Sequence, residues 1–406
     1  MARARKPTPT PPQPTAEAAS PASAWQLSAR ERSLVSRRLL AWFRRHGRDL
    51  PWRRDAQPYR VWVSEIMLQQ TQVERVCDYF RRFLERFPSV ERLAEASEAD
   101  VLAAWQGLGY YRRARQLHAC AQRVVAEHAG RFPSTVAELS ALPGIGRYTA
   151  SAISSIAFGR PEPIVEANSR RVLARLAGYD RPLSGTSGDG PIWEIAAGLV
   201  PARQAGLFNQ ALMDLGAMVC RPAAPSCTAC PLARHCVALR DGRTDELPRL
   251  ATPKPSVAIE EVALLVVHDG QLLVVQRGEA EWWAGLWDVP RAAGPLGPLR
   301  RSAARDGRLL GEVRYGVTHH RVRVDVVQLP TEAAAAARAT VADGSRSPAS
   351  ALGVALASEP AATAWVSLSG LATLAMPSPA RRILELLTSP LSASPGEHIS
   401  SSSISA

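Results

Sequence analysis

Apolar positions recur with helical periodicity through the first 240 residues of the chain. In the first such stretch, apolar side chains repeat every three or four positions over 34–43, and Ser28 followed by Glu31 forms a capping box ahead of them. Further helices are predicted over 61–87, 98–106, 111–128, 147–158, 169–177, 191–199 and 205–219. No convincing strand pattern interrupts them, so this part of the chain is expected to be all-α.

Strand patterns begin only after a proline-rich linker that includes Pro253 and Pro255. Two apolar runs, 262–267 and 272–275, flank Asp269-Gly270, a dipeptide that favours a tight β-hairpin turn. Three further segments are expected: a half-buried strand over 321–326, a loop over the alanine-rich stretch 333–364 and a terminal helix over 381–387. The second part of the chain is therefore expected to be α+β.

Composition indicates a folded protein, because 46% of the 406 residues are hydrophobic and 21% are charged. We expect no transmembrane helix and no secretory signal, since no run of 18 apolar residues occurs and the first 24 residues hold no apolar segment. Six cysteines in a chain of this length exclude a disulfide scaffold. The expected location is the bacterial cytoplasm, at the nucleoid.

The net charge of +12 lies entirely in residues 1–250, because residues 251–406 carry 14 Lys+Arg and 14 Asp+Glu. A basic half beside a neutral half favours a polyanionic partner for the basic half. Arginine outnumbers lysine 47 to 2, however, and the compositional bias of a GC-rich genome would give the same excess. Charge alone therefore leaves both readings open.

Four cysteines, Cys220, Cys227, Cys230 and Cys236, lie within 17 residues in the pattern C-x6-C-x2-C-x5-C. Four thiolates in one proline-interrupted loop are typical of an iron–sulfur cluster or zinc. Structural zinc more often uses two C-x2-C pairs, and only one close pair occurs here. The spacing therefore favours the cluster.

The segment Leu142-Pro143-Gly144-Ile145-Gly146 lies between two predicted helices. Glycines at 144 and 146 permit positive φ and leave backbone N–H groups open to a phosphate. The next helix begins at Arg147, so its N-terminal dipole faces the same anion. In a basic all-α segment, this arrangement predicts a hairpin that holds the DNA backbone without reading its sequence.

These motifs resemble those of the helix–hairpin–helix DNA glycosylases with a [4Fe–4S] cluster, and among them the MutY-type adenine glycosylases. The matching stretches are LPWRR (50–54), VWVSEIMLQQTQV (61–73), GLGYYRRARQLH (107–118), LPGIGRYTASAI (142–153), PIVEANSRRVLAR (163–175), FNQALMDLGAMVC (208–220) and the cysteine loop. The segment 258–388, with WWAGLWDVP at 282–290, resembles the Nudix-like domain with which this family recognises 8-oxoguanine. The resemblance implies removal of adenine mispaired with 8-oxoguanine or guanine in double-stranded DNA, by a monomer.

The resemblance also assigns the catalytic groups. Adenine leaves only after protonation, and a developing oxocarbenium ion needs a nearby anion, so two carboxyl groups suit the reaction. Glu65 lies in an apolar helical stretch where burial would keep it protonated, and the resemblance makes it the acid at adenine N7. Glu166 stands where the family has Asp, which puts the rate in question because its side chain is longer by about 1.5 Å. Asn168 would orient water and the catalytic carboxylate.

Tyr148 distinguishes two branches of the family, because the related glycosylase/lyases carry Lys at this place in the hairpin. A Schiff base needs an amine, and residues 7–253 contain no lysine. A monofunctional glycosylase is therefore expected, with Tyr148 assisting Glu166 at the sugar. A glycosylase/lyase acting on oxidised pyrimidines and a lesion-binding homologue with weakened catalysis remain the alternatives.

The flipped-out adenine and its partner base need further contacts. By the resemblance, Gln70 and Tyr110 wedge the DNA beside 8-oxoguanine and Leu108 packs near it. Trp52 and Arg53 would border the adenine pocket; core packing is the alternative for Trp52 and Leu108.

In the C-terminal segment, Val317-Thr318-His319 stands where the family has a Phe-Ser-His loop, so Thr318 and His319 would contact 8-oxoguanine. Residues 291–312 contain only two acids, which excludes the Glu-rich magnesium site of a Nudix hydrolase.

The expected organisation follows from these assignments. It comprises a disordered basic tail (1–26), a glycosylase domain (27–245), a linker (246–257), a Nudix-like domain (258–388) and a disordered tail (389–406).

Overall fold

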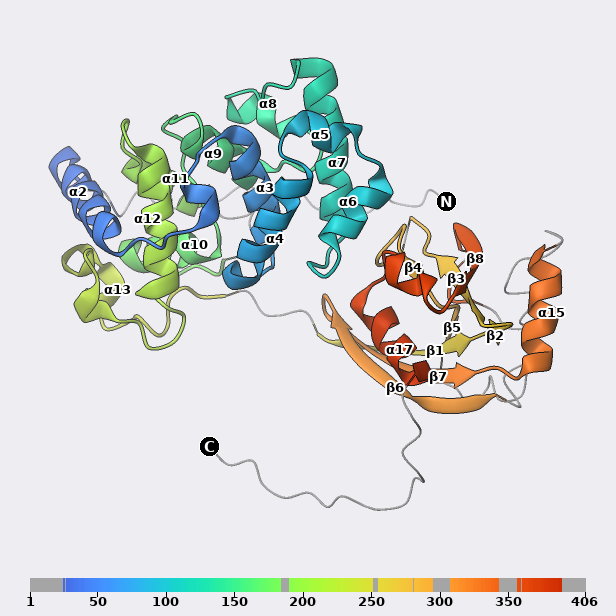
Figure 1. Cartoon of the computed structure of the whole chain (residues 1–406). Coiled ribbons are helices and arrows are strands. Elements are labelled where there is room, and N and C mark those ends of the chain that lie inside the picture. Colours follow the sequence, from blue (N-terminus) through green and yellow to red (C-terminus); the bar gives the residue numbers. More distant parts are fainter. Residues whose placement is uncertain are drawn as a thin grey trace, which may run out of the picture. The chain divides into compact units, whose positions relative to one another are not determined.

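A computed structural model describes residues 25, 27–183, 190–250, 255–279, 281–294, 307–342, 356–358 and 360–388. The chain divides into two compact units, the first formed by residues 1–96 and 116–253 and the second by residues 97–115 and 254–406 (Figure 1). The predicted tails lie outside the described residues except for Trp25, which packs against the core of the first unit because its indole ring is apolar. No described helix is long and apolar enough to cross a membrane.

The described part of the first unit is helical, which confirms the all-α prediction. Its elements are α2 (Ala29–His46), η1 (Pro51–Arg53), α3 (Pro58–Leu68), α4 (Val73–Arg86), α5 (Val90–Glu95), α8 (Val136–Ser140), α9 (Arg147–Ile156), α10 (Ala167–Ala177), α11 (Gly190–Leu199), α12 (Ala205–Met218), η2 (Cys227–Ala229), η3 (Ala233–His235) and α13 (Val237–Arg240). Helix α6 (Glu98–Trp105) belongs to the second unit, and α7 (Arg112–His128) spans the boundary between the two sets of residues. The capping box of Ser28 and Glu31 begins α2 as predicted.

The helical stretch predicted over 61–87 is divided into α3 and α4 by the segment 69–72. Periodicity misses the break because none of its residues is Gly or Pro. Gln70 has a φ of 56°, a left-handed conformation that a side chain adopts at a cost, and it is exposed. The break carries Gln70 to the mouth of the cavity described below.

One apolar core joins α2, α10, α11 and α12, to which Leu39, Leu173, Ile192 and Phe208 contribute fully buried side chains. Burial of each such side chain contributes about 1.5–3 kcal/mol, so these helices form a rigid frame. Residues at the N-terminus of α10 and in the middle of α12 line the cavity described below.

The second unit contains two sheets. Its elements are β1 (Val257–Leu265), β2 (Val267–His268), β3 (Gln271–Gln276), β4 (Trp287–Asp288), β5 (Arg291–Ala293), β6 (Arg308–Val317), β7 (His320–Gln328), α15 (Thr331–Ala342), β8 (Ala362–Ser367), η4 (Gly370–Thr373) and α17 (Ser378–Thr388). One sheet has the order β5-β1-β7-β6, with β1 and β7 parallel, and the other has the order β2-β3-β4 with β8 paired to β3. The predicted hairpin at Asp269-Gly270, the strand over 321–326 and the terminal helix are all present.

Two predictions for this region are wrong. The alanine-rich stretch holds α15 and β8 rather than loop alone, because alanine favours helix and an apolar face of the sheet can receive it. The linker predicted over 246–257 is shorter, since the side chain of Leu247 is buried, its carbonyl accepts a hydrogen bond from Arg175, and β1 already begins at Val257.

Candidate active site

A cavity of about 850 Å³ in the first unit brings together the four predicted catalytic residues and five of the ten predicted DNA contacts. It is lined by Glu65 of α3, Tyr148 at the start of α9, and Glu166 and Asn168 at the start of α10. The other predicted residues that line it are Trp52, Arg53, Gln70, Gly146 and Arg147. The two catalytic carboxyl candidates, 101 positions apart in the sequence, therefore share one cavity.

Glu65 has the environment of a buried acid, with 3% of its surface exposed. Its burial raises the pKa of the carboxyl group to about 7, and the charge of Glu166 acts in the same direction. A hydrogen bond donated by the Tyr148 hydroxyl to Glu65 Oε2, and the charge of Arg53, oppose the rise. Glu65 can therefore hold a proton near neutral pH and release it into the cavity.

The hydroxyl of Tyr148 remains protonated under the same conditions. Burial, followed by the charges of Glu65 and Glu166, raises the pKa of this phenol well above its ordinary value. Tyr148 therefore stays a hydrogen-bond donor to the Glu65 carboxyl group.

Glu166 is the N-cap of α10. Its Oε2 accepts a hydrogen bond of 2.7 Å from the backbone N–H of Asn168, and its Oε1 accepts one of 2.7 Å from that of Ser169. The Ser169 hydroxyl accepts a return bond of 2.8 Å from the N–H of Glu166, which completes a capping box. Burial raises the pKa of Glu166, while these two N–H groups and Arg171 oppose the rise. The longer side chain is thus folded back onto the helix, and capping fixes the carboxylate.

Arg171, which sequence reasoning missed, supports the same end of α10. Its Nη2 donates to Asn168 Oδ1 and to the Gly216 carbonyl, each at 2.9 Å, and its Nε donates to the Cys220 carbonyl at 2.8 Å. Gly216 is required here, because an added Cβ would lie 2.7 Å from the Asn168 Cβ. Asn168 is therefore held from two sides, by an arginine and by a closely packed helix.

Asp214 of α12 holds two arginines that line the cavity. Its side chain is fully buried and accepts hydrogen bonds from Arg48 and Arg53, with the shortest contacts at 2.6 and 2.8 Å. Burial raises the pKa of Asp214, but the two arginines lower it overall. Sequence analysis missed Asp214. The pattern that could have revealed it is an acid within an apolar helix, as at Glu65.

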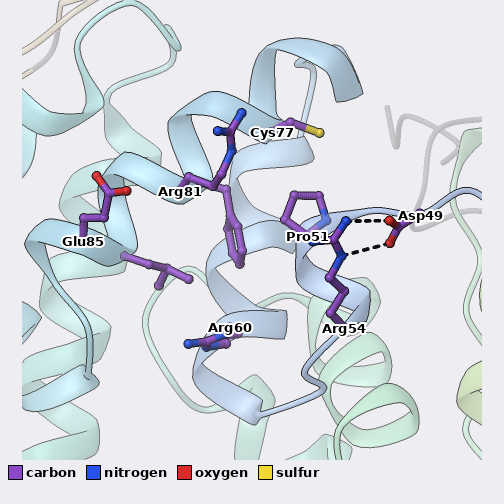
Figure 2. Close-up of a pocket in the computed structure, with 9 residues that line it drawn as sticks. Asp49, Pro51, Arg54, Arg60, Cys77, Arg81 and Glu85 are labelled. Carbon is purple, nitrogen blue, oxygen red and sulfur yellow. Dashed lines mark hydrogen bonds and ion pairs between the residues drawn. The ribbon is translucent and has the colours of Figure 1, made fainter.

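Trp52 forms part of the cavity wall, and its ring packs edge-on against Phe80 at a centroid distance of 5.6 Å. Phe80 in turn lines an outer depression of about 720 Å³. Figure 2 shows this depression, where Arg54 is paired with Asp49 near Pro51. The two aromatic rings of Trp52 and Phe80 therefore stand between the cavity and the depression.

The hairpin before α9 has an open backbone, but only one of its glycines needs a left-handed conformation. Gly144 has a φ of +72°, and an added Cβ would lie 2.7 Å from the Gln116 Cβ. Gly146 has an ordinary φ of −86°, contrary to the expectation of positive φ there, and an added Cβ would meet nothing within 4 Å. The space beside Gly146 is open to a phosphate.

The remaining predicted DNA contacts belong to the second unit. Leu108 is 6% exposed, in agreement with core packing, whereas Tyr110 is 46% exposed and has a φ of 49°. Thr318 and His319 form the turn between β6 and β7, with the Thr318 hydroxyl 3.1 Å from His320 Nδ1. Their contacts with DNA remain predictions.

The four loop cysteines are partly buried. Burial and the charges of the three other cysteines raise the pKa of Cys230 to about 12, and Arg175 Nη1 donates to Cys220 Sγ at 3.4 Å. Within the described residues, no group of three or more His, Cys, Asp or Glu side chains is arranged to hold a metal ion. Soft thiolates are the usual ligands of iron–sulfur clusters, in which each thiolate binds a different iron or shares one with a second ligand rather than all four binding one ion.

The buried acid generates a prediction for stability. The pKa of Glu65 is about 7 in the folded chain against an ordinary value of 4.5, so the folded state binds the proton more tightly and loses stability as the pH rises through 7. Between pH 4 and pH 9 this loss should reach about 3 kcal/mol. Urea unfolding of Glu65→Gln should lack that component, whereas Glu85→Gln, at an exposed site of α4, should retain it. Equal pH dependence in Glu65→Gln and the unchanged chain would contradict the assignment.

Two family models match parts of this chain. The family model of the HhH-GPD superfamily base excision DNA repair proteins matches residues 63–185, and the NUDIX domain model matches residues 261–386. A solved structure of a thermostable thymine-DNA glycosylase aligns with 52% of this chain and 98% of its own, with a TM-score of 0.48 and 28% identity.

Several curated relatives carry the name adenine DNA glycosylase, among them the following three. The protein of Buchnera aphidicola (subsp. Acyrthosiphon pisum) is 35% identical over 64% of this chain and 74% of its own length. The mouse protein is 34% identical over 74% of this chain and 71% of its own, and the human protein is 34% identical over 72% and 66%. With a helical glycosylase unit, a Nudix-like unit and these relatives, the chain belongs to the adenine DNA glycosylase family.

Proposed function

We propose that this chain removes adenine from double-stranded DNA in which adenine is mispaired with 8-oxoguanine or guanine, and that it leaves an abasic site. The observation that carries the proposal is that one cavity contains both Glu65, whose pKa is raised to about 7, and Glu166, whose carboxylate caps α10. Such a pair supplies an acid for the leaving base and an anion for the sugar.

The reaction follows from these positions. Glu65 gives its proton to adenine N7, the bond from N9 to the sugar breaks, and adenine leaves with the bonding electrons. Glu166 stabilises the positive charge that develops on the sugar, while the protonated hydroxyl of Tyr148 donates a hydrogen bond to Glu65. Water then adds to the sugar and returns a proton to Glu65, while Asn168, held by Arg171, orients that water.

Single-turnover release of adenine from an 8-oxoguanine:adenine duplex tests the proposal. The rate should fall as the pH rises through about 7, because the acid form of Glu65 is lost. Glu65→Gln should react at least about 100-fold more slowly. Borohydride should trap no protein–DNA adduct, since residues 7–253 contain no lysine. A trapped adduct would favour the glycosylase/lyase alternative, and tight binding without release would favour the lesion-binding alternative.

Glu166 provides a second, independent prediction. Glu166→Asp keeps both the charge and an N-cap acceptor, so its single-turnover rate should stay within about 100-fold of that of the unchanged chain. Glu166→Gln loses the charge and should be slower by about 100- to 1000-fold. If Gln at this position reacts as fast as Glu, the anion has no part in the reaction.

We further propose that Cys220, Cys227, Cys230 and Cys236 hold a [4Fe–4S] cluster. When bound, the cluster would cross-link the loop that follows α12, and its positive core would offset part of the repulsion between the four thiolates that bind it.

Iron and sulfide analysis of the purified chain checks this assignment. Cys230→Ser should lose most of the iron, whereas Cys77→Ser, on α4, should keep it. Zinc in place of iron in the unchanged chain would refute the cluster.

The second unit would recognise 8-oxoguanine. Its β6–β7 turn presents Thr318, which retains a hydroxyl, and His319. Val317 provides no aromatic ring, so the proposed contacts of that turn with the base are the Thr318 hydroxyl and the His319 imidazole.

A further inference from the structure

Arg147 differs from the other arginines of the cavity in how it is held. It is the first residue of α9 and is exposed, and its Cζ lies 3.9 Å from the centroid of the Trp193 ring. Among the described residues, no acidic side chain forms an ion pair with it, whereas Arg48 and Arg53 are both bound to Asp214. Its positive charge is therefore available to another anion.

Trp193 of α11 is part of the apolar core of the first unit. It is 4% exposed, belongs to the core shared with α2, α10 and α12, and lines the cavity together with Arg147 and Gly146. Within the described part of the chain, its buried indole N–H has no hydrogen-bond partner. Packing, rather than a hydrogen bond, holds the ring in place, and its face supports the guanidinium.

A guanidinium stacked on an aromatic ring uses its face for the stack, which leaves the N–H groups at its edges free. Those edges match the geometry of a phosphate group, to which arginine can donate two hydrogen bonds. Stacking also removes much of the rotamer freedom that a free arginine would lose on binding. Beside it, the start of α9 and the open backbone at Gly146 favour an anion at the same place.

We propose that Trp193 is a positioning residue that holds Arg147 ready for a DNA phosphate at the rim of the cavity. The inference rests on the proposed function only in that DNA is the substrate. It assigns a role to α11, which contains no predicted site residue.

A double-mutant cycle on DNA affinity tests the proposal. The probe is a labelled duplex that contains a tetrahydrofuran abasic site, so that binding is measured without chemistry. Arg147→Ala should weaken binding and lower the slope of log Kd against log salt by about 0.9, the contribution of one phosphate contact. Trp193→Leu should weaken binding by roughly two- to fivefold, and Trp193→Phe, which keeps a ring, by less. In the Arg147→Ala background, neither change at Trp193 should weaken binding further.

Arg82, stacked on Tyr79 of α4 at 4.6 Å and not among the residues that line the cavity, is the matched control. Arg82→Ala removes the same charge and should change the salt slope less than Arg147→Ala does. Equal effects of the two alanine variants, or an equal loss from Trp193→Phe with and without Arg147, would overturn the proposal. Because the probe cannot react, failure to release adenine would reject the proposed function and leave this result unaffected.

Discussion

The hydrogen bond from Tyr148 to Glu65, made in a place from which water is largely excluded, is the interaction on which the catalytic cavity depends. Burial makes the ionised form of Glu65 costly, and the negative charge of Glu166 nearby makes it costlier still. The hydroxyl of Tyr148 offsets part of that cost, so the carboxyl group is neither permanently charged nor permanently neutral near pH 7. A catalytic acid that must later accept a proton needs this intermediate condition.

Glu166 shows how a structural and a chemical role can be joined in one group. The first N–H groups of a helix have no partner within the helix. At α10 the Glu166 carboxylate accepts two of them, and the same side chain lines the cavity. The N–H dipoles that favour its charge belong to a helix packed into the apolar core with α12. The position of the anion is therefore set by the fold of the whole frame, and Arg171 carries that constraint on to Asn168 and to the cysteine loop.

Local patterns in the sequence were sufficient for most helices and for the hairpin at Asp269-Gly270, and the family resemblance located both carboxyl groups of the cavity. They were insufficient where tertiary contacts decide the structure. Gln70 interrupts a helical pattern without any helix-breaking residue, and the alanines of α15 form a helix on a sheet face that the sequence does not display. Arg171 and Trp193 act through partners at distant positions, and no short-range pattern of residue types reveals such partners.

The contact between Trp52 and Phe80 connects the wall of the cavity with the wall of the depression in Figure 2. On the proposed function, the space available to a purine is governed in part from α4, a helix that supplies none of the proposed catalytic groups. Replacement of Phe80 by a smaller residue would let the tryptophan ring retreat and widen the chamber. Selectivity among bases could then drift during evolution while every acid, amide and hydroxyl of the reaction stayed in place.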